Sequence, residues 1–440
     1  MIHKKIFSII CITALLCTFA IATQSVSAIE IKFRSFSGAA AIGPPADAYA
    51  AKLESMTTTI IGDSGKVTFT KLSPRPAVPD EFGGNIVAAV GAGGPLAGGN
   101  GFDAAYTSGS SLNKVWGFLY NSGVPFGPNY DEFLGFLYGK SVNGGSESGL
   151  DLLQKTLDLR KRNVIAIPIV GSAQQGSGYF MKPVGNAGSM SGIGLSGLCQ
   201  QDWTFRYLPP AQYVLDLACD NLAAKGVIEK KNIKFVTAVA GGKIIQNIID
   251  GKVQAFEFAT PLDDMSVLFS RPEGNPGTVG ARFLHYPGWH QPFLITYLII
   301  NKNVWNMLNP AQQTLVMSVA RDHVSSSYGE NLSQQGAKLQ EILNANKDDK
   351  DEKNDIVLVR WPDKDLELLK DATIQFLNAR SDDESLNAED RQDYGNILRA
   401  FREYVSQNNG YWKGRDVPSA FRFFNWTDSK GKESWDQGFK

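Results

Sequence analysis

The sequence is poor in the residues and short motifs of common catalytic sites. Its 440 residues include four histidines and four cysteines. It has no H-E-x-x-H metal motif, no C-x-x-C pair and no G-x-S-x-G nucleophile turn. His285 and His290 flank a Tyr-Pro-Gly-Trp segment, a spacing that is not typical of helical metal ligands. A nucleophile and a base can still meet from distant segments, but nothing in the sequence indicates such a pair. We therefore do not expect an enzyme.

An excess of either charge is also absent. The chain has 43 Lys and Arg against 44 Asp and Glu, for a net charge of −1. This balance argues against nucleic acid or an anionic membrane as the main partner. With 43% hydrophobic residues, the composition excludes collagen and long disordered tracts. The length predicts two or three domains.

Long apolar runs are missing except near the N-terminus. Lys4 and Lys5 precede a mostly apolar run over 6–20, and small residues follow up to Ala28. This pattern is typical of a signal peptide over 1–28, cleaved near Ala28. A retained membrane anchor is the alternative, but the run is shorter than the roughly 20 residues that a span needs. We therefore expect an exported protein.

Export would leave two cysteines, Cys199 and Cys219. In an oxidising compartment they can form a disulfide. Two buried free thiols are the alternative, because a sequence does not reveal the required geometry. The choice stays open at this point.

Strand and helix patterns alternate in the first half of the chain. Alternating residues at 29–36 and 67–72 predict two strands, and the helical spacing at 46–56 lies between them. Such a β-α-β unit predicts a largely parallel sheet. The apolar run 163–170 predicts a buried strand.

Two glycine-rich stretches interrupt this pattern, and the last third is helical. The stretch 83–101 lacks a complete G-x-G-x-x-G and the P-loop lysine, so we interpret it as a flexible connection. The Gly- and Ser-rich stretch within 181–203 predicts a surface excursion. A long helix is expected over 310–346, with helices near 363–380 and 387–407.

An exported α/β protein with two lobes is suited to capturing a solute between them. The chemistry requires few groups. One arginine can bind a carboxylate through two parallel hydrogen bonds. A carboxylate and an amide can hold a cation.

Several segments resemble the extracytoplasmic solute receptors of TRAP transporters, in the branch that binds 2-oxoacids and other small carboxylates. The segments are G-V-P-F-G at 123–127, residues 163–180, F-R-Y-L-P at 205–209, residues 248–264 and Y-P-G-W-H at 286–290. The resemblance implies a periplasmic α/β binding protein, type II-like, with two lobes, an interlobe cleft and long C-terminal helices.

The resemblance also leads us to expect a division of the chain between the lobes. Lobe I would comprise 29–162 and 252–284, and lobe II would comprise 163–251 and 285–309. Residues 310–440 would pack across both lobes.

Site residues follow from the same resemblance. Arg206 matches the carboxylate-binding arginine, and an ordinary surface arginine is the alternative. Gln175, Glu257 and the backbone carbonyl of Phe258 match the ligands of a Na⁺ or Ca²⁺ ion that bridges to the substrate. Gln174 is adjacent, so the register can shift by one residue. Phe258 stands where relatives usually have Trp.

Other positions bear on the rest of the cleft. Trp289 and Phe126 either contact the substrate or pack in the core. Small polar residues at 108–110 replace expected tyrosines, and Gln291 stands where an acid is common. These departures leave open a larger or uncharged solute.

The resemblance therefore implies a solute-binding protein that delivers a 2-oxo or 2-hydroxy monocarboxylate to TRAP permease subunits in the membrane. The helix 310–346 is compatible with a homodimer and equally with a monomer. We further expect that Arg206→Ala abolishes carboxylate binding and leaves the fold intact.

Overall fold

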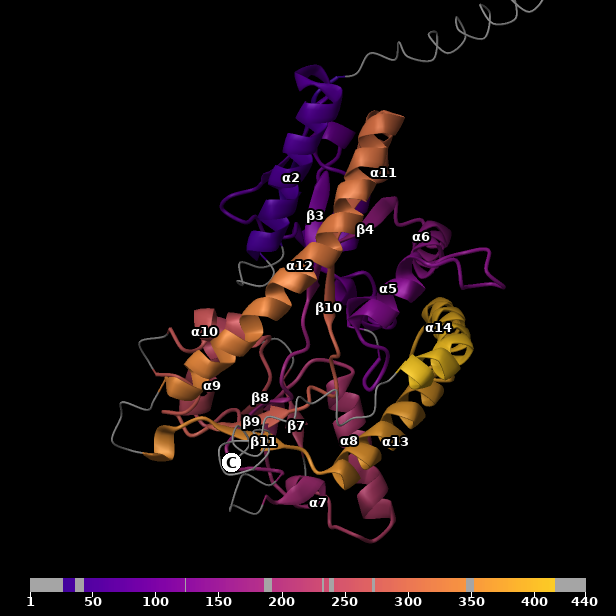
Figure 1. Ribbon diagram of the computed structural model, residues 1–440. Helices are drawn as coiled ribbons and strands as arrows, with labels where there is room; N and C mark the ends of the chain where they lie inside the picture. The colour runs from indigo at the N-terminus through magenta and orange to yellow at the C-terminus, as the bar shows by residue number, and fades with distance from the viewer. Residues whose placement is uncertain are drawn as a thin grey trace, which may run out of the picture.

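The computed structural model describes residues 27–35, 43–122, 124–185, 192–231, 233–236, 241–270, 274–345 and 352–415 (Figure 1). Residues 1–26 of the expected signal peptide lie outside these ranges. Two mixed sheets, each covered by helices, form two lobes, which confirms the predicted two-lobed α/β fold. None of the described helices is both long enough and apolar enough to cross a bilayer.

The first sheet has five strands in the order β2-β1-β3-β10-β4. Parallel pairing joins β1 (Ile29–Arg34) to β2 (Val67–Lys71) and to β3 (Ala104–Ser108), as the β-α-β pattern predicts. Strand β10 (Leu294–Asn301) lies antiparallel between β3 and β4 (Val164–Ser172). The expectation of a largely parallel sheet is therefore wrong for the half that β3, β10 and β4 form.

The second sheet has six short strands in the order β11-β9-β5-β8-β6-β7. In that order the strands are Val357–Arg360, Phe283–Tyr286, Gly178–Phe180, Ala255–Phe256, Thr204–Arg206 and Lys234–Phe235. Strands β6 and β8 are parallel, with Arg206 opposite Phe256. This pairing places Arg206 next to Glu257.

Sheet membership differs from the expected lobe ranges. Strands β4 and β10 belong to the first sheet, although the expected boundaries place them in lobe II. Strand β8 belongs to the second sheet, although the boundaries place it in lobe I, and the boundary at residue 284 divides β9 of the same sheet. The chain crosses between the sheets after β4 and again before β10. The sequence of an apolar strand that is buried on both faces does not indicate which sheet the strand joins.

Helix α12 (Pro310–Asn344) connects the two lobes (Figure 1). Near β4, the hydroxyl of Ser327 accepts from the Gly171 N–H at 3.0 Å, and the Asn331 side chain accepts from the Ala173 N–H at 2.8 Å. Farther along, Gln335 accepts from the N–H of Leu262 in α10 (Pro261–Val267) at 3.2 Å. The long helix predicted from residue 310 is confirmed.

The C-terminal helices α13 (Asp363–Ala379) and α14 (Ala388–Arg415) also contact both lobes. Helix α13 packs on α8 (Ala211–Ala224) of the second lobe. Helix α14 packs against α6 (Gly149–Leu159) of the first lobe. Between these two helices, the side chain of Arg160 forms an ion pair with Asp393 at 2.8 Å.

The first glycine-rich stretch is ordered, so its interpretation as a flexible connection is wrong. Residues Ile86–Ala92 form helix α3, whose first turn is capped by the side chain of Asn85. A Cβ at Gly101 would lie 1.8 Å from the Ala89 carbonyl oxygen. Glycine here permits close backbone packing.

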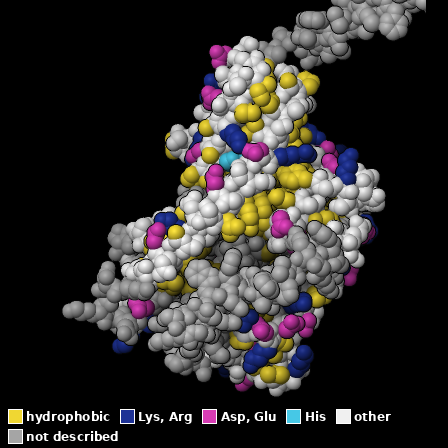
Figure 2. Space-filling model, viewed as in Figure 1, with side chains coloured by type: hydrophobic (Ala, Val, Ile, Leu, Met, Phe, Trp, Pro, Cys, Tyr) yellow, Lys and Arg dark blue, Asp and Glu magenta, His cyan; other side chains and the backbone are white. Residues whose placement is uncertain are grey.

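The second glycine-rich stretch, within 181–203, is anchored to the second lobe by buried side chains and a disulfide. Within its described part, helix α7 (Gly194–Leu198) buries Leu195 and Leu198 completely. Cys199 forms a disulfide with Cys219 of α8, which resolves the choice that the sequence left open. On the face in Figure 2, acidic and basic side chains are interspersed.

Candidate ligand-binding site

Arg206 and Glu257 form the centre of the candidate site. Arg206 ends β6, and the N–H of Glu257 donates to the Arg206 carbonyl at 3.1 Å. The Arg206 Nη1 donates to Glu257 Oε1 at 2.8 Å and also to the Glu257 carbonyl oxygen. Arg206 is 7% exposed and Glu257 is 1% exposed. The sequence-predicted pair is therefore a buried ion pair.

The environment of this pair leaves the Nε donor of Arg206 available. The Arg206 Nε is buried and has no hydrogen-bond partner. Burial raises the pKa of Glu257, and the charge of Arg206 opposes this rise. A buried donor without a partner is costly unless a ligand completes it. Arg206 is thus suited to receive an acceptor oxygen.

Gln175 lies in the segment that crosses between the sheets, just before β5. Its Nε2 lies 3.5 Å from Glu257 Oε2, 3.1 Å from His290 Nε2 and 2.7 Å from Gln291 Oε1. The neighbouring Gln174 instead donates to the Gly288 carbonyl at 3.1 Å. Gln175 is therefore the residue that faces Glu257.

The Tyr-Pro-Gly-Trp-His segment packs directly on this crossing segment. The N–H of Ser177 donates to the His285 carbonyl at 2.7 Å. A Cβ at Gly288 would lie 1.8 Å from the Gln175 carbonyl oxygen. Gly288 therefore permits the two crossings to touch, and it sets the place of Gln175.

His290 follows in the same segment and is neutral. Its ring stacks on Tyr207, with centroids 5.7 Å apart and an interplanar angle of 5°. Burial, with the charge of Arg206 as a second cause, lowers the pKa of His290 to about 3. Its Nδ1 is buried without a partner. A neutral imidazole with one open nitrogen can accept or donate a hydrogen bond to a ligand.

None of the three aromatic residues proposed from the sequence is part of the pocket lining. Phe126 stacks on Trp289 with centroids 5.8 Å apart, and Trp289 is 3% exposed within the main hydrophobic core. Neither residue lines the pocket described below. Phe258 is half-buried and packs against a hydrophobic cluster of the second lobe. These positions favour packing for Phe126, whereas the buried Nε1 of Trp289 has no hydrogen-bond partner and is open to a ligand.

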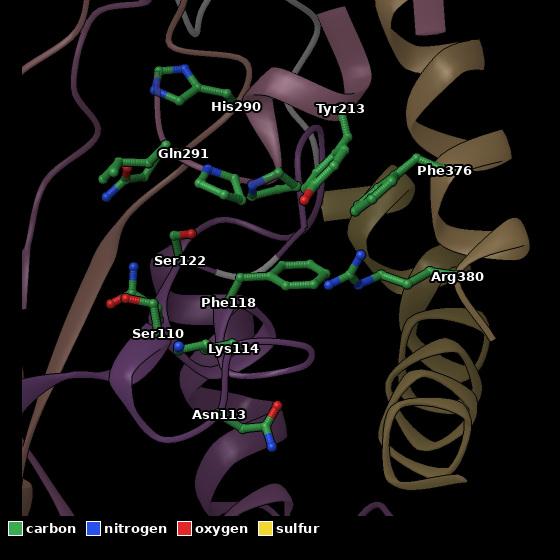
Figure 3. Close-up of a pocket in the computed structure, with 14 residues that line it drawn as sticks. Ser110, Asn113, Lys114, Phe118, Ser122, Tyr213, His290, Gln291, Phe376 and Arg380 are labelled. Carbon is green, nitrogen blue, oxygen red and sulfur yellow. The ribbon is translucent and has the colours of Figure 1, made fainter. Parts of the chain in front are cut away.

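A pocket of about 380 Å³ lies between the lobes (Figure 3). Residues within 110–122 of the first lobe form one side, and residues within 208–213 of the second lobe form another. Helix α13 and its C-terminal end close the right side of the view. His290 and Gln291 also line the pocket. Both residues also contact Gln175, so they link the pocket lining to the Arg206–Glu257 site.

Sequence reasoning did not single out most of this lining. His290 lay in a motif, and Gln291 was noted only as a departure from the family. Tyr213, Phe376 and Arg380 carried no signal, since they come from distant helices. Only the fold brings these helices to the pocket.

The donor set fits the cation that the resemblance implies. Glu257 and Phe258 supply a carboxylate and a backbone carbonyl, both hard oxygen donors that suit Na⁺ and Ca²⁺. Gln175 can add its amide oxygen if the side-chain amide is turned over, since its Nε2 faces Glu257 here. No group of three His, Cys, Asp or Glu residues able to hold a metal occurs in the described ranges. A cation would therefore depend on amide and backbone oxygens of this kind.

Comparison with known proteins identifies a curated relative over part of the chain. No protein-family profile matches the chain. A stretch of 204 residues is 24% identical to a monocarboxylate 2-oxoacid-binding periplasmic protein of Nostoc sp.. The match covers 46% of this chain and 45% of the relative, so it spans less than half of that protein's length.

Solved structures match over a larger part of the chain. A TRAP periplasmic solute-binding protein from Pseudoalteromonas atlantica, with bound sodium and pyruvate, is 14% identical, with a TM-score of 0.64; the match covers 90% of this chain and 99% of that one. A TRAP solute-binding protein from Bordetella bronchiseptica is also 14% identical, with a TM-score of 0.62 and coverage of 90% and 96%. That structure is a dimer of mixed occupancy with calcium and picolinate in one site. The resemblance seen in the sequence is confirmed, and the chain has the fold of these proteins.

Proposed function

We propose that the chain is the solute-binding protein of a TRAP-type uptake system. It acts in the periplasm and captures a small organic acid with a 2-oxo or 2-hydroxy carboxylate head. Lobe closure then presents the acid to permease subunits in the membrane. The observation that carries the proposal is the buried, unpartnered Nε of Arg206. Arg206 does not itself line the interlobe pocket, but Leu208, two residues further along the chain, does. The fold and the Nostoc relative support the same reading.

Arg206 is the proposed carboxylate clamp. Its planar guanidinium can donate two parallel hydrogen bonds to a carboxylate, whereas lysine cannot match this fork. Nη1 already binds Glu257, so the remaining donors are those that a ligand uses. His290 Nδ1 is a second open group next to Arg206.

Charge balance supports a bound cation at this site. Arg206 and Glu257 compensate each other when both are ionised, so an incoming carboxylate adds one uncompensated negative charge to a buried site. Such a charge is expensive without a partner. We propose Na⁺ or Ca²⁺ at Gln175, Glu257 and the Phe258 carbonyl as that partner. Bound there, the cation would attract the carboxylate and keto oxygens of the solute.

Binding without catalysis is the proposed activity, since both compared structures are solute-binding proteins. A homodimer is compatible with the Bordetella structure, which contains one. A larger or uncharged solute is the second candidate, because 380 Å³ exceeds the space that a three-carbon acid fills.

Thermal unfolding against a panel of small carboxylates tests the proposal. The panel pairs each 2-oxo acid with its carboxamide, which has the same shape without the charge. A ligand at 100 times its dissociation constant adds about 2.7 kcal/mol to folded-state stability. We expect acids to raise the midpoint, amides to leave it unchanged, and a chelator in sodium-free buffer to remove the effect. No shift with any acid would refute the proposal, and a shift with amides alone would favour the uncharged solute.

A further inference from the structure

The interlobe pocket carries positive charge without a matching acid. Lys114 and Arg380 line it, and none of the lining residues is acidic. Neither side chain forms an ion pair within the described residues. Two acids outside the lining interact with this region: Asp390 accepts from Asn113 Nδ2 at 2.8 Å, and Asp383 interacts electrostatically with Arg380. Two basic groups facing one space favour an anion there.

Arg380 is held in place by its neighbours. Its guanidinium carbon lies 5.6 Å from the ring centroid of Tyr213 and 5.7 Å from that of Phe376. These rings stack on each other 5.5 Å apart at 8°. The Arg380 Nε donates to the Val115 carbonyl at 3.2 Å. A cation fixed over two rings is preorganised for an anion.

The pocket lining follows the proposed carboxylate clamp, Arg206, closely along the chain. Arg206 is outside the lining but lies two residues before Leu208, which lines the pocket. His290 and Gln291 line the pocket and also contact Gln175. Figure 3 shows the guanidinium of Arg380 extending from the end of α13 toward Phe118, with Lys114 on the other side of that ring. Both basic groups thus lie across the pocket from His290.

We propose that the pocket binds a second anionic group, so that the solute is an acid with a carboxylate or similar anion at its far end. The inference rests on the proposed function for the head group, and it replaces the monocarboxylate expected from the sequence. The apolar surfaces of Phe118, Tyr213 and Phe376 would cover the carbons between the two charged ends.

Calorimetric titration of matched ligands tests this inference. The ligands are five-carbon 2-oxo acids that end in methyl, carboxamide or carboxylate. For the unaltered chain we expect the carboxylate-ended acid to bind about tenfold more tightly than the methyl-ended acid, as one charge-assisted contact provides. Equal or tighter binding of the methyl-ended acid would overturn the inference.

Variants assign the effect to the two basic residues. Lys114→Gln is the primary variant, because Lys114 is exposed and we expect the fold to tolerate its loss. Arg380→Gln is the second, with its unfolding midpoint measured alongside. Lys370→Gln is the matched control: it removes the same charge from an exposed residue of α13 outside the pocket. We expect Lys114→Gln and Arg380→Gln to reduce the tenfold preference and Lys370→Gln to preserve it. A preference unchanged in both pocket variants would overturn the inference.

A final ligand separates this inference from the proposed function. If no 2-oxo acid binds, the proposed head-group site is wrong. A saturated five-carbon dicarboxylate, which lacks the 2-oxo group, then probes the pocket alone. Binding that is weakened by Lys114→Gln would preserve the second-anion inference, and absence of binding would overturn it as well.

Discussion

The Nη1 of Arg206 lies 2.8 Å from Oε1 of Glu257, and both side chains are buried. The sequence suggested each residue separately, one for the solute and one for a cation. Their direct contact means that the two roles are coupled. Any ligand that engages one side chain changes the electrostatic environment of the other.

This contact changes the expectation for Arg206→Ala. Removing the arginine leaves Glu257 buried without its counter-ion, which typically costs about 3–5 kcal/mol. The earlier expectation that the fold stays intact does not allow for this cost. Adding Glu257→Gln removes the stranded charge, so we expect the double variant to recover at least about 1 kcal/mol relative to Arg206→Ala. Urea denaturation of the two single variants and the double variant measures the coupling, and additive losses would contradict it.

Gly288 provides a test of how the two crossing segments pack. Gly288→Ala places a methyl group against the Gln175 carbonyl, so we expect a loss of about 1–3 kcal/mol and weaker ligand binding. Gly329→Ala is the control, since nothing lies within 4 Å of its Cβ position in α12. There we expect stability to rise by about 0.5–1 kcal/mol. Denaturation curves that show equal effects at both positions would rule out the close contact.

His285 predicts a specific pH dependence of stability. It is fully buried, its Nε2 accepts from the Val184 N–H at 2.9 Å, and its Nδ1 lies 2.8 Å from the Phe283 carbonyl. Burial lowers the pKa of His285 to about 3, against about 6.5 when unfolded. The unfolded chain therefore binds the extra proton first, so this histidine's contribution to stability falls as the pH drops below about 6.5.

Comparison with His285→Gln isolates that contribution, because other titrating groups are common to both proteins. We expect the stability advantage of the unaltered chain to shrink by about 1.4 kcal/mol per pH unit between pH 6 and pH 4. Denaturant titrations at several pH values measure it. An advantage that stays constant across this range would mean that His285 is protonated in the fold.

The local pattern of the sequence predicts much of the fold. The helix from residue 310 and the strands near residues 29, 67 and 164 are found within a few positions. Their periodicity depends on neighbouring residues alone. Strand β10 has no such signature, because Leu294–Asn301 is buried on both faces and does not alternate. Its antiparallel insertion between β3 and β4 depends on contacts far along the chain.

The candidate site, like the fold, was predictable from the sequence only in part. The sequence and its resemblance identified Arg206, Gln175 and Glu257, and the structure brings these three together. The basic lining of the pocket was not foreseen, because Lys114 and Arg380 are separated by more than half of the chain. No local pattern distinguishes Arg380 from a solvated arginine at a helix end.

The most direct test is calorimetric titration of a 2-oxo acid into the unaltered chain and into Arg206→Lys, in the presence of sodium or calcium. Lysine keeps the counter-charge for Glu257 but loses the planar fork. We predict a dissociation constant at least about tenfold higher for the variant, with an unfolding midpoint close to that of the unaltered chain. Equal dissociation constants for the two proteins would contradict the assignment of Arg206 as the carboxylate clamp.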